Sequence, residues 1–114
     1  MHGTIISGTG KGAYFVKIYT PVFQEALRIS PYPGTLNLRL RNVPAFPATR
    51  ISIQQEGYGR VDCYPVLIHK NYKAFLLRPH KTIHPETVVE FISEKNLRND
   101  LELHDGDVLE WSWS

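Results

Sequence analysis

Hydrophobic and polar residues alternate along several short stretches of the chain, and the clearest of these is GTLNLRLR at residues 34–41. Its leucines, at positions 36, 38 and 40, lie on one face of an extended strand, and the polar residues between them lie on the other face. This pattern predicts a half-buried β-strand.

Further stretches rich in β-branched and aromatic residues predict strands at residues 2–7, 50–55, 60–69, 74–79, 87–93 and 108–113. A helix is expected after AYFVKIY, with Thr20 as its N-cap and Pro21 in its first turn, and it should end before Pro31. Residues 96–101 predict a short helical turn, and residues 42–49 a surface loop. Consecutive strands without long helices predict an all-β or β-rich fold, a barrel with one or two short helices.

Composition narrows the class of protein. The chain has 114 residues, 42% of them hydrophobic and 21% charged, which suits a single globular domain spanning residues 1–114. Its net charge of +2 is spread along the chain, so we expect neither a nucleic-acid nor a membrane partner. The one cysteine, Cys63, has no disulfide partner, and no signal peptide or membrane span is visible. We expect a cytoplasmic monomer with Cys63 buried.

The first candidate site is the glycine-rich segment GTGKG, which comprises Gly8, Thr9, Gly10, Lys11 and Gly12. Closely spaced glycines let successive backbone N–H groups point at one anion, and the lysine adds a positive charge. The segment could therefore hold phosphates, although it lacks the Gly-Lys-Ser/Thr of a Walker loop. An ordinary glycine hairpin is the alternative.

The second candidate is PGTLN, in which strand alternation places Thr35 and Asn37 on the same face, about 7 Å apart along the strand. Both offer neutral oxygen ligands. They could hold a hard cation such as Mg²⁺ whose charge is met mainly by the phosphates it accompanies. The alternative is the solvent face of a half-exposed strand, but asparagine is uncommon in strands.

The third candidate is Glu90, which lies among apolar residues in TVVEFIS. A buried carboxylate needs hydrogen-bond partners, which a ligand hydroxyl or ring N–H could supply. A raised pKa would suit proton transfer. The alternative is a glutamate at a barrel rim that pairs with arginine or lysine.

Two histidines, His80 and His84, are spaced four residues apart, as metal ligands often are. The segment has prolines on both sides and no accompanying cysteine, and the HExxH pattern is missing, so a metal site is not favoured. The basic group of Arg78, His80 and Lys81 is expected to line an anionic site or face solvent.

Five motifs in order resemble the archaeal CTP-dependent riboflavin kinases along almost the whole chain: GTGKGAYF, PYPGTLNLRL, RPHKTIH, VVEFIS and LELHDGD. The resemblance implies a compact six-stranded cradle-loop barrel, related to swapped-hairpin DNA-binding domains. It also implies a reaction that converts riboflavin and CTP into FMN and CDP.

The resemblance also implies roles for individual residues. The segment from Gly8 to Ala13 would bind the nucleotide diphosphate, and Thr35 and Asn37 would be the Mg²⁺ ligands. The flavin-binding positions would be Thr82 and Glu90, and a second nucleotide-binding segment would comprise Lys95, Asn96, Leu97 and Arg98. Ala13 carries no charge, which predicts a weaker hold on the nucleotide at that end of the loop. Glu90 as catalytic base for the ribityl hydroxyl is an additional hypothesis, prompted by its apolar strand.

Two alternatives from other classes stay open. One is a DNA-binding barrel of the swapped-hairpin type, although the basic residues are not clustered as phosphate contacts to DNA require. The other is a non-catalytic flavin- or nucleotide-binding module. The helix-turn-helix domain of some members is not seen in this sequence, so transcriptional autoregulation is not expected, and residues 41–60 hold no familiar motif.

Overall fold

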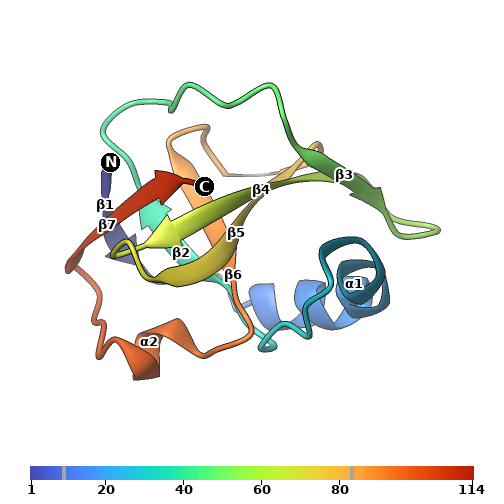
Figure 1. Cartoon of the computed structure of the whole chain (residues 1–114), viewed down its shortest axis with the longest axis horizontal. Coiled ribbons are helices and arrows are strands. Elements are labelled where there is room, and N and C mark those ends of the chain that lie inside the picture. The colour runs from blue at the N-terminus through green and yellow to red at the C-terminus, as the bar shows by residue number, and fades with distance from the viewer. Residues whose placement is uncertain (9, 83) are drawn as a thin grey trace.

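The backbone consists mainly of antiparallel strands (Figure 1), in a computed structural model that describes residues 1–8, 10–82 and 84–114. The elements among these residues, in chain order, are β1 (His2–Ile6), α1 (Gly12–Leu27), β2 (Leu36–Arg39), β3 (Ile51–Gln54), β4 (Arg60–Ile68), β5 (Tyr72–Pro79), β6 (Val88–Ile92), α2 (Leu97–Asp100) and β7 (Val108–Trp113).

Six of these strands close into a barrel. The strand order is β3-β4-β5-β6-β2-β1-β7, and β4 also pairs with β7, which joins the two sides of the sheet. Strand β3 is therefore an extra strand outside the closed ring. The predicted six-stranded barrel with short helices is confirmed.

Strand β4 closes the barrel because one of its edges carries two partners in succession. Its first half pairs with β3 up to Cys63, and its last residues pair with β7 from Val66 onward. Between them, the Pro65 carbonyl accepts a 3.0 Å hydrogen bond from the Ser114 N–H. The N–H and C=O of one strand residue point to the same strand edge. Pro65 has no N–H, and the position where that donor would lie is the one at which the pairing with β3 has ended and the pairing with β7 begins.

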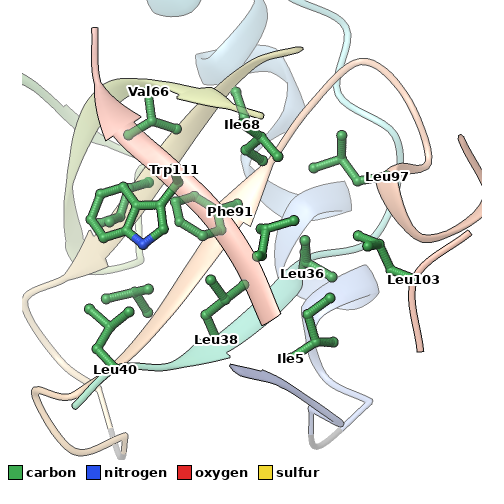
Figure 2. Packing of buried hydrophobic residues seen from close by; sticks show 14 of the residues in the cluster. Ile5, Leu36, Leu38, Leu40, Val66, Ile68, Phe91, Leu97, Leu103 and Trp111 are labelled. Atoms are coloured by element: carbon green, nitrogen blue, oxygen red, sulfur yellow. The ribbon is translucent and has the colours of Figure 1, made fainter. Parts of the chain in front are cut away.

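The barrel interior is filled by large apolar side chains from every strand of the ring (Figure 2). The leucines of β2 and the residue after it, predicted to share one face, all point inward: Leu36, Leu38 and Leu40 are at most 6% exposed. Phe91 and Trp111 pack edge to face, with ring centroids 5.5 Å apart.

A second core lies outside the barrel, between α1 and the outer face of the sheet. The buried residues of α1 are Val16, Tyr19, Phe23 and Leu27, which form one stripe along the helix. They meet sheet residues that include Val61, Cys63, Leu77 and Ile92. Figure 1 shows α1 beside the sheet near β3, with α2 separate from it.

The prediction for the start of α1 is wrong. The helix begins at Gly12, so Pro21 lies inside it rather than in its first turn. The reason is that Val16 and Tyr19 belong to the buried stripe, and their burial offsets the hydrogen bond that an exposed internal proline removes. The end agrees with expectation, because Arg28 adopts a left-handed φ of 59° before Pro31. Neither helix among the described residues has the length and apolar character needed to cross a bilayer.

Cys63 is fully buried in the second core, as predicted. Burial, with a smaller contribution from the charge of Asp62, raises the pKa of its thiol to about 12. The thiol therefore stays protonated and packs as a small apolar group.

The barrel interior should dominate stability. Replacing Phe91 by alanine removes a fully buried ring and leaves a cavity, so we expect a loss of about 3–5 kcal/mol in the free energy of unfolding. Val108 is 63% exposed on β7, and Val108→Ala should cost less than about 0.5 kcal/mol. Denaturant unfolding of both variants measures the difference, and equal losses would contradict the packing described here.

Candidate functional site

The glycine-rich segment lies directly against Thr35 and Asn37. A Cβ atom added to Gly8 would lie 2.2 Å from Nδ2 of Asn37, and one added to Gly12 would lie 2.4 Å from Oγ1 of Thr35. Real Cβ atoms essentially never approach other atoms this closely, so a side chain at Gly8 or Gly12 would force Asn37 or Thr35 to move. The segment connects β1 to α1, which contradicts the alternative of a glycine hairpin.

This contact borders a cleft of about 700 Å³, which we call the glycine-loop cleft. It lies at the start of α1, whose first turn holds no acidic residue. The unpaired N–H groups and positive dipole at a helix N-terminus favour an anion there. The cleft is lined by Ser7, Gly8, Gly10, Gly12, Ala13, Gly34, Thr35, Asn37, Arg98, His104 and Asp105.

Asn37 is only 7% exposed, so it is not on a solvent face as the alternative for PGTLN required. Its Oδ1 atom is buried and has no hydrogen-bond partner among the described residues. Such an oxygen is costly to bury unless something binds it. With the Thr35 hydroxyl lining the same cleft, this oxygen fits the preference of Mg²⁺ for hard ligands.

A second cavity, of about 420 Å³, opens where β5 and β6 separate beyond Leu77 and Glu90, the last residues that they pair. We call it the β5–β6 pocket. Thr82 and Glu90, the two predicted flavin positions, both line it. Its walls include the apolar side chains of Phe46, Leu76, Leu77, Val88 and Val89. The polar and charged half of the lining comprises Asp62, Arg78, His80, Thr82, His84, Glu86 and Glu90. A pocket with such a mixed lining can hold an organic ring that carries polar groups.

Glu90 faces this pocket with a histidine partner. Its Oε1 lies 2.8 Å from Nε2 of His84, and the two side chains are 17% and 25% exposed. Burial raises the pKa of Glu90, while the charge and hydrogen bond of His84 oppose that rise. The predicted partner was a ligand, arginine or lysine, so His84 was missed in this role. The spacing of the histidines drew attention to metal binding instead.

The other histidine of that pair binds a different acid. His80 Nε2 and Arg50 Nε lie 3.0 Å and 3.3 Å from the same oxygen of Asp62. Desolvation acts to raise the pKa of Asp62, but hydrogen bonds from His80 and Ser52 and the charges of His80 and Arg50 outweigh it and lower the pKa. No local motif marks Asp62, because its partners come from distant parts of the sequence.

One cross-strand pair connects the two cavities. In the antiparallel ladder of β2 and β6, Asn37 is directly opposite Glu90. Side chains opposite each other share a face, with Cβ atoms about 4.5–5.5 Å apart. The buried amide of the glycine-loop cleft and the carboxylate of the β5–β6 pocket are therefore neighbours.

The segment from Lys95 to Arg98 borders a smaller cavity of about 240 Å³. Gly34, Thr35 and Arg98 line both this cavity and the glycine-loop cleft, so the two adjoin. All four predicted residues of the segment line it, although Leu97 is mostly buried in the barrel core.

The remaining predicted residues lie in different places. Ala13 lines the glycine-loop cleft. Lys11 instead lines a neighbouring cleft together with Tyr58 and Lys81. Thr9 is outside the described residues, so its predicted contact with a nucleotide stays a prediction, as does that of Lys11.

Comparison with known proteins identifies the family of the chain. The family model CTP-dep_RFKase, described as "Domain of unknown function DUF120", matches residues 5–112. A protein of Staphylothermus marinus named riboflavin kinase is 37% identical over 115 residues, covering 96% of this chain and 88% of the relative. The chain belongs to this riboflavin kinase family.

Other riboflavin kinases of the family are longer. The protein of Methanocella arvoryzae is 37% identical over 119 residues, which cover 96% of this chain and 55% of the relative. That of Pyrococcus furiosus is 38% identical over 115 residues, covering 92% of this chain and 54% of the relative. The chain spans about half the length of these two relatives.

The ion pairs of Asp62 predict a pH dependence of stability in this riboflavin kinase family member. Because folding lowers the pKa of Asp62, its ionised form stabilises the fold above the unfolded-state pKa of about 4. That stabilisation is lost as the pH falls through the lower folded-state pKa. Asp62→Asn should therefore cost about 1–2 kcal/mol at pH 7 and progressively less below about pH 4.

Denaturant unfolding of the parent chain and of Asp62→Asn across this pH range makes the measurement. Asp100→Asn removes the same charge from an exposed position on α2 and is the matched control, with an expected effect below about 0.5 kcal/mol at every pH. A cost for Asp62→Asn that does not change with pH would contradict the prediction.

Proposed function

We propose that this chain transfers the γ-phosphoryl group of CTP to riboflavin and releases FMN and CDP. The observation that carries the proposal is the pairing of Asn37 with Glu90, which brings a phosphate-type cleft and a ring-type pocket to one point. Transfer between two bound substrates requires this juxtaposition, because most of the catalysis lies in positioning. The name riboflavin kinase, carried by the similar curated proteins, supports the choice of acceptor.

The nucleotide would lie along the glycine-loop cleft and the adjoining small cavity. The glycine N–H groups and the N-terminus of α1 would bind the phosphates. The base would enter the cavity beside Lys95 and Asn96. The choice of CTP as donor rests on the name of the family model and on the sequence resemblance.

Thr35 and Asn37 would hold a Mg²⁺ ion that accompanies the phosphates. The bound ion would neutralise charge on the transferring group. The backbone at Gly8 and Gly12 lies directly against the side chains of Asn37 and Thr35 and would restrict how these two ligands are oriented at the cleft. The buried Oδ1 of Asn37 is the atom that most needs such a partner.

Riboflavin would occupy the β5–β6 pocket, with its ribityl chain extending toward Glu90. We propose Glu90 as the base. The terminal ribityl oxygen forms a bond to the γ-phosphorus, and its proton passes to the Glu90 carboxylate. The bond from the γ-phosphorus to the β–γ bridging oxygen breaks, and CDP leaves with the electron pair. His84, 2.8 Å from Glu90, holds the carboxylate in place.

Turnover tests the proposal directly. Purified protein with Mg²⁺ and riboflavin should form FMN with CTP, and not with ATP, GTP or UTP, when the product is followed by chromatography. Asn37→Ala should lower kcat/KM for CTP by at least about 100-fold, because it removes a ligand that acts on the transferring charge. Asn42→Ala, an equivalent change in an exposed loop, should leave it unchanged. If no FMN forms with any of the four donors, the result would instead favour a non-catalytic binding module or a DNA-binding barrel.

Glu90→Gln tests the proposed base. The substitution keeps the shape of the side chain but removes its ability to accept the proton, so kcat should fall by about 10²–10⁴-fold while both substrates still bind. Glu94→Gln, at an exposed position just past the same strand, is the matched control and should keep normal turnover. Near-normal turnover by Glu90→Gln would rule out its role as base and leave the phosphoryl transfer itself intact.

A further inference from the structure

A carboxylate lies at the edge of the glycine-loop cleft, where phosphates would be expected to repel it. Asp105, in the turn before β7, lines the cleft. Its Oδ1 accepts a 2.6 Å hydrogen bond from Nη2 of Arg98, and its Oδ2 accepts one from the Ser7 hydroxyl. These contacts hold the pKa of Asp105 below its usual range, so the group is ionised. An acid beside an anion site needs an explanation.

Both partners of Asp105 are elements of the proposed nucleotide site. Ser7 immediately precedes the glycine-rich segment. Arg98 lines both the glycine-loop cleft and the adjoining small cavity, and its Nη2 atom bonds to Asp105, another residue of the cleft lining. The same Nη2 atom also donates to the Ile6 carbonyl at 3.3 Å, at the end of β1. The guanidinium carries five N–H donors, so these two bonds leave others for a ligand.

Asp105 is not needed to fold this corner of the molecule. Backbone hydrogen bonds already join the turn to β1: Gly106 N–H donates to the Ile5 carbonyl, and Ile5 N–H donates to the Asp107 carbonyl, both at 2.8 Å. The side chains of Arg98 and Asp105 are 36% and 52% exposed, and ion pairs this exposed contribute little to stability. The backbone therefore determines the position of the turn, and the contacts among Ser7, Arg98 and Asp105 orient these three side chains.

We propose that Asp105 is a positioning residue for the nucleotide: it holds Arg98 and the start of the glycine-rich segment in the arrangement that binds the phosphates. This inference rests on the proposed function. Asp105 would help an anion to bind although it carries a negative charge itself, because an arginine held in one orientation loses less entropy on binding than a mobile one.

The direction in which Asp105→Asn changes the Kd for CTP distinguishes a positioning role from a simple charge effect. If Asp105 acts by orienting Arg98, Asp105→Asn should raise the Kd for CTP with Mg²⁺ about 10-fold. If it is only a nearby negative charge, the same substitution should leave the Kd unchanged or lower it. Asp100→Asn removes an equal charge from α2, outside the residues that line the cavities, and should change the Kd by less than about twofold.

Titration calorimetry on the whole chain measures these Kd values. A double-mutant cycle with Arg98 tests whether Asp105 acts through that residue. In an Arg98→Ala background, Asp105→Asn should weaken CTP binding by clearly less than about 10-fold, because only the contact of Asp105 with Ser7 is then left to lose. The Kd for riboflavin and the thermal unfolding midpoint should stay those of the parent chain.

Two results would overturn the inference: a Kd for CTP that does not rise in Asp105→Asn, or a full 10-fold loss that persists without Arg98. A parent chain that binds no CTP would instead contradict the proposed function from which the inference starts. The two failures are therefore distinguishable.

Discussion

Closure of the barrel depends on a single strand that changes partner along one edge. Strand β4 pairs with β5 over its whole length, and on its other edge with β3 and then β7. Only the second of those pairings completes the ring and encloses the apolar interior. Pro65 lies at the change, where it costs the ladder no hydrogen bond. A strand continuously paired with β3 would leave an open sheet whose interior side chains faced water.

The same arrangement explains why the site is on the outside of the barrel. Large side chains of the described residues fill the interior, and the two cavities described above lie at the glycine-rich segment and where β5 and β6 separate. Alternate residues of β2 point to opposite faces: Leu36 and Leu38 fill the core, while Asn37 faces the glycine-rich segment. One short strand thus supplies both core residues and the Asn37 side chain that we propose as a Mg²⁺ ligand.

Much of this could be predicted from the sequence, because strand alternation and turn residues act locally. The leucine ladder, the positions of the strands and the three candidate sites follow from such patterns. The start of α1 could not be predicted, since Pro21 is a local signal and the burial of Val16 is a tertiary effect. The partners of Asp62 and Glu90 were missed for the same reason. They meet these residues only when the chain folds, so the spacing of residues along the sequence does not indicate the pairs.

The register between β2 and β6 also limits where insertions and deletions can be tolerated in the sequence. Inserting or deleting one residue within either strand would turn Asn37 or Glu90 toward the leucine core and bring an apolar side chain out in its place. Changes in length within residues 41–50 or in the turn between β3 and β4 leave that pairing intact. Homologues should therefore vary in length at these two connections and keep both strands free of insertions and deletions.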